Sequence, residues 1–202
     1  MRKWSPIVVA LMAALAVSTH CTPAAQARPT WEPPSNRQLL RLYQLDPYIR
    51  YFTARTYGPR DTTVPADYIR ALILTESGGN WLAQSGKGAR GLTQIMPATA
   101  REALRELASH GDEYAFVDDT LLEDFSDEDL YDPAINILIA CHITAKYRAR
   151  YKESTELVVS AWNAGPTAVA RHGYRPPPYI ETLTSIARVE NYMRFFAGTA
   201  VY

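Results

Sequence analysis

The sequence predicts an all-α protein, and three observations support this fold class. From about residue 37 onwards, apolar residues recur at intervals of three and four, which is the period of a helix with one buried face. Prolines stand where the first turn of a helix tolerates them, and glycines follow the ends of the apolar stripes. No stretch alternates apolar and polar residues for long enough to require a sheet. We therefore expect helices, with at most a minor β element.

The expected helices follow one another closely along the chain. Residues 28–36 are rich in proline and predict an extended lead-in, and a helix over 37–56 should be interrupted at Pro47. A second helix should start at Pro65 and end at Gly78 and Gly79. Further helices are expected from Pro97, from Pro133 with Asp132 as the N-cap, over 154–163, from Pro166 to Gly173, and over 179–197. We divide this part of the chain into an N-terminal extension with a helix (28–63) and a helical domain (64–198).

The N-terminus has the features of a secretory signal peptide. Arg2 and Lys3 provide a positive start, residues 7–17 form an apolar run, and Ala25-Gln26-Ala27 offers a small-x-small cleavage site. We expect cleavage after Ala27 and a periplasmic or secreted protein, with an uncleaved membrane anchor as the alternative. Lipidation at Cys21 is disfavoured, because the bulky His20 precedes it.

Composition narrows the classes of partner. The 202 residues suffice for one globular domain with a hydrophobic core, and 21 lysines and arginines balance 21 acidic residues. This balance gives no indication of a nucleic-acid partner. Removal of residues 1–27 leaves Cys141 as the only cysteine, so no internal disulfide can form, and we expect a buried, inert thiol.

Residues 111–131 contain nine carboxylates and no lysine or arginine. Such a run usually forms a solvated loop, which is our main expectation. The alternative is a docking surface for a basic partner, such as a secretion or envelope complex. An EF-hand calcium loop fits poorly, because no glycine occupies the sharp-turn position.

Glu76 is the candidate catalytic residue, because a carboxylate is unexpected at this position. It follows Leu72 by four residues and Ile73 by three, so it continues the apolar face of the second predicted helix. Burial and the negative end of the helix dipole both disfavour the anion, so we expect a raised pKa. A general acid for glycosidic-bond cleavage requires such a group. Glu76 alone is also compatible with an arginine ion pair or with exposure at the helix end.

Four motifs in a fixed order favour the catalytic role of Glu76 over these alternatives. They are Glu76-Ser77, the block GARGLTQIMPATA over 88–100, SAWNAG over 160–165 and PPYIET over 177–182. A helix start with Asp132, Pro133, Asn136 and Ile137 lies between the second and the third. With these motifs the sequence resembles the soluble lytic transglycosylases, whose SLT domain is lysozyme-like. The resemblance covers roughly residues 64–195.

The resemblance implies a lysozyme-like helical fold of the goose-type or SLT kind over 64–198, and a lyase that cleaves peptidoglycan. Glu76 would be the catalytic acid and then the base. The implied substrate-binding residues are Ser77, Ser85, Gln94, Met96, Trp162, Asn163, Tyr179 and Glu181. No metal or cofactor is implied.

Three positions depart from the family pattern. Trp162 stands where the family has a tyrosine, which removes a phenolic hydroxyl near the reacting centre, and Thr93 replaces a methionine. Ser185 occupies the position of an expected tyrosine after Glu181, so Glu190 is an alternative for the family's glutamate. We favour Glu181.

The implied chemistry needs only one protein carboxyl group. No Asp or Glu occurs between Glu76 and Glu102, whereas ordinary glycosidases use two carboxylates. In the family, Glu76 would protonate the oxygen between N-acetylmuramic acid and N-acetylglucosamine, and the sugar's own C6 hydroxyl would close a 1,6-anhydro ring. The alternatives are a hydrolytic goose-type muramidase and a non-catalytic glycan-binding scaffold of a secretion system.

Overall fold

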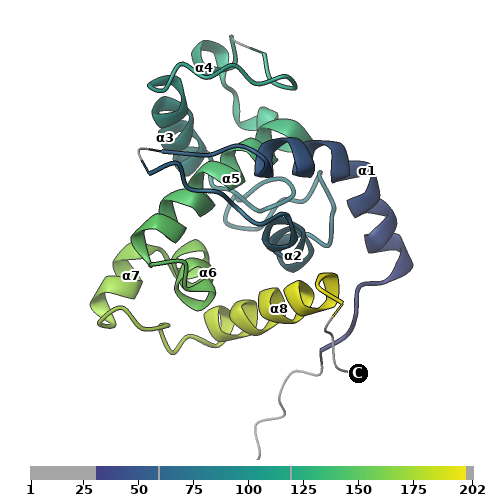
Figure 1. The fold of residues 1–202 in the computed structure, drawn as a ribbon, viewed down its shortest axis with the longest axis vertical. Coiled ribbons are helices and arrows are strands. Elements are labelled where there is room, and N and C mark those ends of the chain that lie inside the picture. The colour runs from purple at the N-terminus through teal and green to yellow at the C-terminus, as the bar shows by residue number, and fades with distance from the viewer. Residues whose placement is uncertain (1–30, 59, 119, 199–202) are drawn as a thin grey trace, which may run out of the picture. The chain divides into compact units, whose positions relative to one another are not determined.

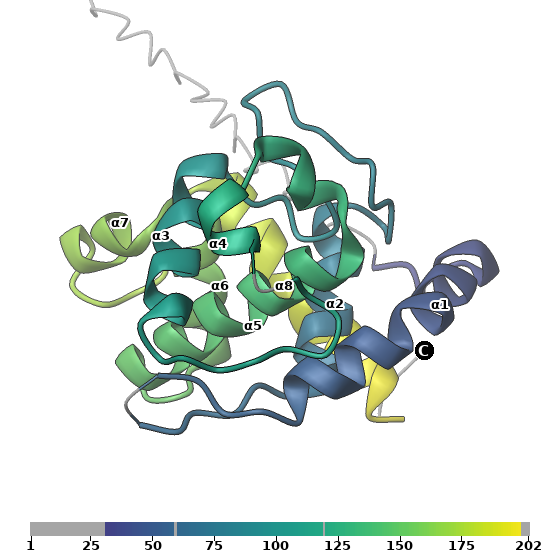
Figure 2. The ribbon, with the colours of Figure 1, turned by 90° about the horizontal axis from the view of Figure 1, so that it is seen from above.

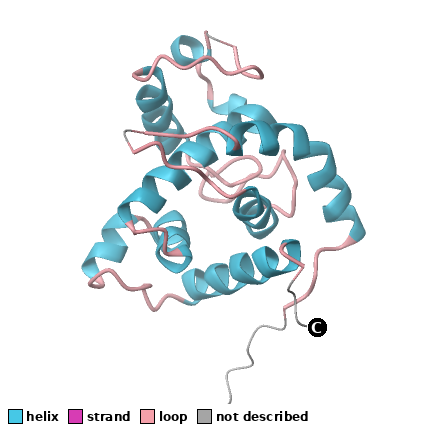
Figure 3. Cartoon of the chain, in the orientation of Figure 1, coloured by secondary structure: helices cyan, strands magenta, loops and turns pink. Residues whose placement is uncertain are grey.

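Helices make up the regular structure of the protein, and their boundaries follow local signals in the sequence. The computed structural model describes residues 31–198 except 59 and 119, and of Leu122 and Glu123 only the backbone. The helices are α1 (Asn36–Thr53), α2 (Ala66–Glu76), α3 (Pro97–Ala108), α4 (Leu121–Asp124), the 3-10 helix η1 (Asp127–Tyr131), α5 (Pro133–Arg150), α6 (Thr155–Ala164), α7 (Pro166–Arg171) and α8 (Ile180–Phe196). In the described part of the chain, β structure is limited to isolated bridges (Figure 3). The predicted all-α fold is confirmed.

Helix α5 is the central element of the unit that begins at Trp31. It contacts α1, α2, α3, α6 and η1, and Figures 1 and 2 both show it running between these elements. Its residues from Ala134 to Ala145 are buried on every side, rather than on one face as expected from the sequence. Asp132 caps the helix as predicted, because its carboxylate accepts hydrogen bonds from the N–H groups of Ala134 and Ile135 (2.7 and 3.1 Å).

Helices α2 and α8 form the most extensive helix pair, and α8 also packs on α6. In Figure 1, α2 is seen nearly end-on between α5 and α8. Helix α2 thus packs against α1, α5 and α8, so side chains from distant parts of the sequence can meet around it.

The expectation that Pro47 interrupts the first helix was wrong. Helix α1 continues through Pro47 from Asn36 to Thr53. A proline inside a helix costs about 3 kcal/mol, but buried apolar side chains on both sides of Pro47 offset this cost. They are Leu42, Leu45, Ile49 and Phe52. Pro47 itself is exposed, so the backbone carbonyl that it leaves without a helix partner lies on the solvent side.

The acidic segment 111–131 is more ordered than the expected solvated loop. It contains α4 and η1, and Leu121 and Leu130 pack into the core. Asp127 forms an ion pair with Arg101, and Glu128 forms one with Arg90 at 2.6 Å. The segment is therefore attached to the rest of the protein by both apolar packing and charge.

The structure tests the expectation for Cys141 but not the one for the N-terminus. Cys141 is fully buried, as predicted, and burial raises the pKa of its thiol, so the group is not a reactive thiolate. The predicted signal peptide, residues 1–27, lies outside the described residues. In the part that is described, no helix combines the length and apolar character needed to cross a membrane.

Candidate active site

Helix α2 places Glu76 at its last position, at the end of an apolar stripe. Ile69, Leu72 and Ile73 are fully buried, and Glu76 continues their side of the helix with a partly buried side chain. Gly78 and Gly79 follow with φ of 60° and 78°, a backbone conformation that ends the helix. The sequence predicted this boundary correctly.

The carboxyl group of Glu76 has a pKa of about 7, raised from an ordinary value of 4.5. Burial is the main cause, because it disfavours the charged form. The positive charge of Arg188 opposes the shift, and the negative charge of Glu181 adds to it. Both residues belong to α8, so this helix sets the electrostatic surroundings of Glu76. The predicted direction of the shift is confirmed.

Ser77 fixes the end of α2 to the glycine-bearing loop rather than pointing freely outward. Its hydroxyl donates a hydrogen bond of 2.7 Å to the carbonyl oxygen of Leu92. A second contact of 3.3 Å reaches the carbonyl oxygen of Ile73. Both interactions involve backbone, so Ser77 positions the loop next to Glu76.

The loop over 84–96 is closed by backbone hydrogen bonds. Residue pairs Gln84–Arg90 and Arg90–Ile95 form antiparallel bridges. Gly91 has φ of +77°, and a Cβ atom there would lie 2.1 Å from the carbonyl oxygen of Leu130 and 2.3 Å from Nδ2 of Asn136. No other residue fits at this position.

Asn136 anchors this loop from α5, a role that the sequence did not reveal. Its Oδ1 accepts hydrogen bonds from the N–H of Thr93 (3.0 Å) and from the hydroxyl of Thr93 (2.7 Å). Its Nδ2 donates to the carbonyl oxygens of Arg90 (3.2 Å) and Leu130 (2.9 Å). Asn136 and Thr93 are both fully buried. The departure of Thr93 from the family's methionine thus accompanies a buried hydrogen bond.

Ser85 and Gln94 both make contacts within the loop. The hydroxyl oxygen of Ser85 accepts hydrogen bonds from the N–H groups of Lys87 and Ala89 (3.3 and 3.0 Å). Gln94 has a positive φ of 52°, and its Nε2 donates to the carbonyl oxygens of Ala83 and Gly91 (3.1 and 3.0 Å). The amide nitrogen of Gln94 is therefore occupied, and its Oε1 is the atom left to accept a bond from a ligand.

Three predicted substrate-binding residues line one groove. Gln94, Met96 and Trp162 border a cavity of about 180 Å³, together with Tyr147 of α5 and Pro166 of α7. Met96 is exposed, and Trp162 packs partly against the core. The groove therefore joins the loop to the C-terminal end of α6, and an indole on its wall can stack on a sugar ring.

The remaining predicted residues, Asn163, Tyr179 and Glu181, lie at the end of α6 and at the start of α8. The hydroxyl of Thr182 donates a hydrogen bond of 2.6 Å to Oδ1 of Asn163, which ties α6 to α8 beside Glu181. Tyr179 is exposed and packs edge-to-face on His172, with ring centroids 5.6 Å apart. Glu181 is exposed, and its charge acts on Glu76.

Glu190, the alternative to Glu181, has another partner. Its carboxylate lies 3.4 Å from the guanidinium of Arg194, one turn along α8. Arg188 was not singled out from the sequence. The signal for it is a spacing of seven residues from Glu181, which puts both on one face of α8.

The site contains acids, amides and aromatic rings but no metal cluster. Within the described residues, no group of three or more His, Cys, Asp or Glu side chains is arranged to hold a metal ion. The structure offers a partly buried carboxyl group with a pKa of about 7 at the end of α2. Ser77 bonds this end of the helix to the loop whose residues Gln94 and Met96 line the groove, while Glu76 itself is not among the lining residues.

A family model and a protein of known sequence both relate this chain to transglycosylases. A family model described as the transglycosylase SLT domain matches residues 57–177. A Haemophilus influenzae protein with the assigned name soluble lytic murein transglycosylase is 27% identical over 124 residues, which cover 61% of this chain and 18% of that protein.

Solved structures of large soluble lytic transglycosylases have a similar fold. The 70 kDa enzyme from Escherichia coli superimposes with a TM-score of 0.57 and 25% identity, over 77% of this chain and 24% of that one. Slt from Pseudomonas aeruginosa, solved as an inactive mutant, gives a TM-score of 0.55 and 21% identity over 84% of this chain and 25% of its own. This chain thus spans about a quarter of the length of these structures and 18% of the Haemophilus influenzae protein. The predicted lysozyme-like fold is confirmed, and because the family model covers more than half of the sequence, the chain belongs to the transglycosylase SLT domain family.

Proposed function

We propose that this protein is a peptidoglycan lytic transglycosylase in which Glu76 is the single catalytic acid and base. The observation that carries the proposal is the pKa of about 7 at Glu76, in a partly buried position at the end of α2. A group with this pKa is half protonated at neutral pH, so it can donate a proton and take one back. The family membership and the relatives named for murein cleavage support the same activity.

In the proposed reaction Glu76 first donates a proton and then accepts another. Glu76 protonates the oxygen between N-acetylmuramic acid and N-acetylglucosamine, and the bond from C1 to this oxygen breaks with its electron pair going to the leaving oxygen. The C6 hydroxyl of the muramoyl sugar then attacks C1 and gives its proton to the Glu76 carboxylate. This closes the 1,6-anhydro ring, restores the acid and consumes no water. Because the attack is intramolecular, it gains several kcal/mol over a bimolecular step.

Arg188 and Glu181 would balance the two protonation states of Glu76. Arg188 favours the carboxylate that exists between the two proton transfers, and Glu181 favours the acid that starts the reaction. Gln94 and Trp162 would hold the sugar in the groove, through the free Oε1 of Gln94 and the indole face. Ser77 and Ser85 would act through the loop that they hold.

Product analysis on purified peptidoglycan tests the proposal. The wild-type protein should release muropeptides with 1,6-anhydro ends, and Glu76→Gln should release none while it still binds the strands. Reducing ends instead of anhydro ends would establish a hydrolytic muramidase. No products from the wild-type protein, with strand binding retained, would establish a glycan-binding scaffold.

The proposed substrate requires a location outside the cytoplasmic membrane. This agrees with the secretory signal proposed for residues 1–27, with cleavage after Ala27. N-terminal sequencing of the protein exported by a bacterial host tests this: a mature chain that begins at Arg28 supports it, and a chain that retains residues 1–27 contradicts it.

The acidic segment 111–131 is the proposed docking surface for an envelope or secretion complex. Several of its carboxylates, including Asp112, Glu113 and Asp124, are exposed, whereas Asp127 and Glu128 pair with arginines of this chain. Neutralising Asp112, Glu113 and Asp124 together should reduce co-purification with the complex and leave strand cleavage unchanged. Unchanged co-purification would contradict docking through this surface.

A further inference from the structure

Tyr147 of α5 lines the groove that also contains Gln94, Met96 and Trp162. Its side chain is partly buried against the core, and its ring centroid lies 6.2 Å from that of Tyr151. Neither the sequence motifs nor the proposed reaction gives Tyr147 a role. It is therefore a groove residue whose polar group still needs an explanation.

The hydroxyl group of Tyr147 is unused within the described part of the chain. It makes no hydrogen bond with another described residue, and it is not among the side-chain atoms that are buried without a partner. The hydroxyls of Tyr68 and Tyr151, by contrast, are both buried and unpartnered. The Tyr147 hydroxyl is therefore accessible from outside, where a bound ligand can reach it.

The phenol of Tyr147 stays protonated at neutral pH. Burial is the main cause that raises its pKa to about 12, and the nearby Tyr151, Glu102 and Glu106 add to the shift. A protonated phenol donates one hydrogen bond. Tyr147 therefore offers a donor rather than a negative charge.

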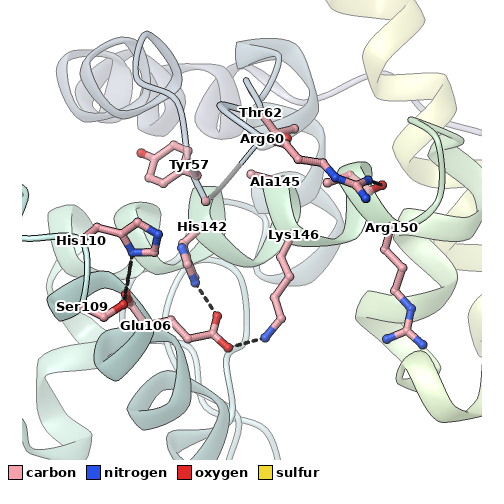
Figure 4. Close-up of a pocket in the computed structure, with 12 residues that line it drawn as sticks. Tyr57, Arg60, Thr62, Glu106, Ser109, His110, His142, Ala145, Lys146 and Arg150 are labelled. Atoms are coloured by element: carbon pink, nitrogen blue, oxygen red, sulfur yellow. Dashed lines mark hydrogen bonds and ion pairs between the residues drawn. The ribbon is translucent and has the colours of Figure 1, made fainter.

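The two carboxylates near Tyr147 do not compete for this donor. Both oxygens of Glu106 are engaged, one by Nε2 of His142 at 2.7 Å and the other by the ammonium group of Lys146 (Figure 4). Glu102 lies 3.6 Å from the same ammonium group. Because these acids are held by Lys146 and His142, the Tyr147 hydroxyl remains free for a ligand.

Tyr147 and Gln94 together give the groove one donor and one acceptor. Nε2 of Gln94 is occupied by the carbonyl oxygens of Ala83 and Gly91, so its Oε1 is left to accept a hydrogen bond. A secondary amide has one N–H and one C=O, and it can use both groups. The cavity of about 180 Å³ is smaller than the roughly 300–1,000 Å³ of pockets that enclose a whole small ligand. It is therefore suited to one substituent of a sugar, such as an acetamido group.

Trp162 makes the donor on Tyr147 more important. It stands where the family has a tyrosine, and its indole lacks the phenolic hydroxyl of that residue. Tyr147 belongs to α5 rather than α6, yet it lines the same cavity as Trp162. The groove thus contains a phenol although its sequence motif does not.

We propose that the Tyr147 hydroxyl donates a hydrogen bond to the N-acetyl carbonyl oxygen of the sugar in the groove, and that Tyr147 thereby determines a preference for N-acetylated strands. Gln94 accepts the N–H of the same acetamido group through Oε1. This inference rests on the proposed function, because it takes the ligand of the groove to be the glycan of peptidoglycan. Tyr147 is a binding residue, and neither proton transfer of the proposed reaction passes through it.

Strand binding in the absence of turnover tests the proposal. The probes are glycan strands freed of peptides by an amidase, either fully N-acetylated or chemically de-N-acetylated, and every protein carries Glu76→Gln to prevent cleavage. Relative to Glu76→Gln alone, Tyr147→Phe should weaken binding of the N-acetylated strands by about fivefold in isothermal titration, as expected for one neutral hydrogen bond. Tyr147→Phe should not weaken binding of the de-N-acetylated strands. Unchanged binding of the N-acetylated strands, or equal weakening with both probes, would overturn the proposal.

A second tyrosine provides the matched control. Tyr43→Phe makes the same chemical change at an exposed position on α1, and it should bind both probes like Glu76→Gln alone. Both tyrosine variants should keep the melting temperature of Glu76→Gln, because neither hydroxyl has a hydrogen-bond partner among the residues that the structure describes. A lower melting temperature of Tyr147→Phe, with both probes bound more weakly, would show that the hydroxyl supports the fold instead.

Cleavage assays separate this inference from the proposed function. With Glu76 intact, Tyr147→Phe should raise KM on N-acetylated strands by about the same factor and leave kcat nearly unchanged, because the hydrogen bond is present in both the bound state and the transition state. A lower kcat with unchanged KM would assign Tyr147 to the chemical step and contradict the proposal. Absence of cleavage by the wild type would refute the proposed function, while the titrations would still decide the role of Tyr147.

Discussion

The hydroxyl of Thr93 donates a 2.7 Å hydrogen bond to Oδ1 of Asn136, and both side chains are fully buried. The bond joins the loop beside Glu76 to the central helix across 43 residues of sequence. Since the same amide also binds the carbonyl oxygens of Arg90 and Leu130, Asn136 connects three segments of chain. Together with the bond from Ser77 to Leu92, this side chain holds the loop that lines the groove in place.

Replacing Asn136 by alanine should therefore destabilise the protein severely. The substitution removes the partner of the Thr93 N–H, the Thr93 hydroxyl and the carbonyl oxygen of Leu130, while the carbonyl oxygen of Arg90 keeps its bond from the N–H of Ile95. An unpartnered buried group costs about 1–3 kcal/mol. We expect a loss of roughly 3 kcal/mol or more in the free energy of unfolding, measured by urea denaturation.

Two threonine variants separate the contribution of the Thr93 hydroxyl. Thr93→Val keeps the shape and removes one hydrogen bond to Asn136, so it should cost about 1–2 kcal/mol. Thr167→Val, at an exposed position on α7, is the matched control and should change stability by less than about 0.5 kcal/mol. A Thr93→Val protein as stable as the control would show that this bond contributes nothing.

A methyl group at Gly91 should be incompatible with the loop. Its Cβ would lie 2.1 Å from the backbone carbonyl oxygen of Leu130, and φ of +77° is unfavourable for alanine. Gly91→Ala should lower the free energy of unfolding by more than about 3 kcal/mol or prevent folding. Gly86→Ala is the control, because nothing lies within 4 Å of its Cβ position, and it should be neutral. Near-native melting of Gly91→Ala would contradict the described loop geometry.

Much of this architecture was predictable from local signals. Asp132 caps α5 and Gly78 ends α2 as the sequence indicated, because capping depends on residues a few positions apart. The raised pKa of Glu76 was also predictable, since it follows from a carboxylate that continues an apolar helical face. These are properties of single segments.

Contacts between distant segments were not predictable in this way. The sequence placed Asn136 only at a helix start, and nothing in the spacing shows that its amide reaches Thr93. The acidic segment was expected to be a loop, because the arginines that pair with it, Arg90 and Arg101, lie elsewhere in the chain. Pro47 was expected to break α1, because propensity does not include the burial of Ile49 and Phe52 beyond it.

Activity should depend on pH through Glu76. The acid form starts the proposed reaction, so kcat/KM should fall as the pH rises above about 7. Because Arg188 lowers the pKa of Glu76, Arg188→Gln should move this alkaline limb to higher pH. Because Glu181 raises it, Glu181→Gln should move the limb to lower pH. Arg175→Gln, an exposed residue that is not among the groups acting on Glu76, should leave the profile unchanged. Shifts of the same sign in the Arg188 and Glu181 variants would contradict this electrostatic arrangement.

Glu76 should also make the folded protein less stable at high pH. Its pKa is about 7 in the folded state and 4.5 ordinarily, so the folded state binds the proton more tightly than the unfolded chain. The stability that this provides is present in full below pH 4.5 and is lost as the pH rises through 7. Glu76→Gln does not titrate, so relative to the wild type it should gain stability from about pH 5 to pH 8, by up to about 3 kcal/mol. Urea denaturation at pH 5 and pH 8 measures this difference. Glu190→Gln, at a position paired with Arg194, is the matched control and should show no comparable gain. A pH-independent difference between Glu76→Gln and the wild type would mean that the carboxyl group titrates normally, and the proposed acid would lose its physical basis.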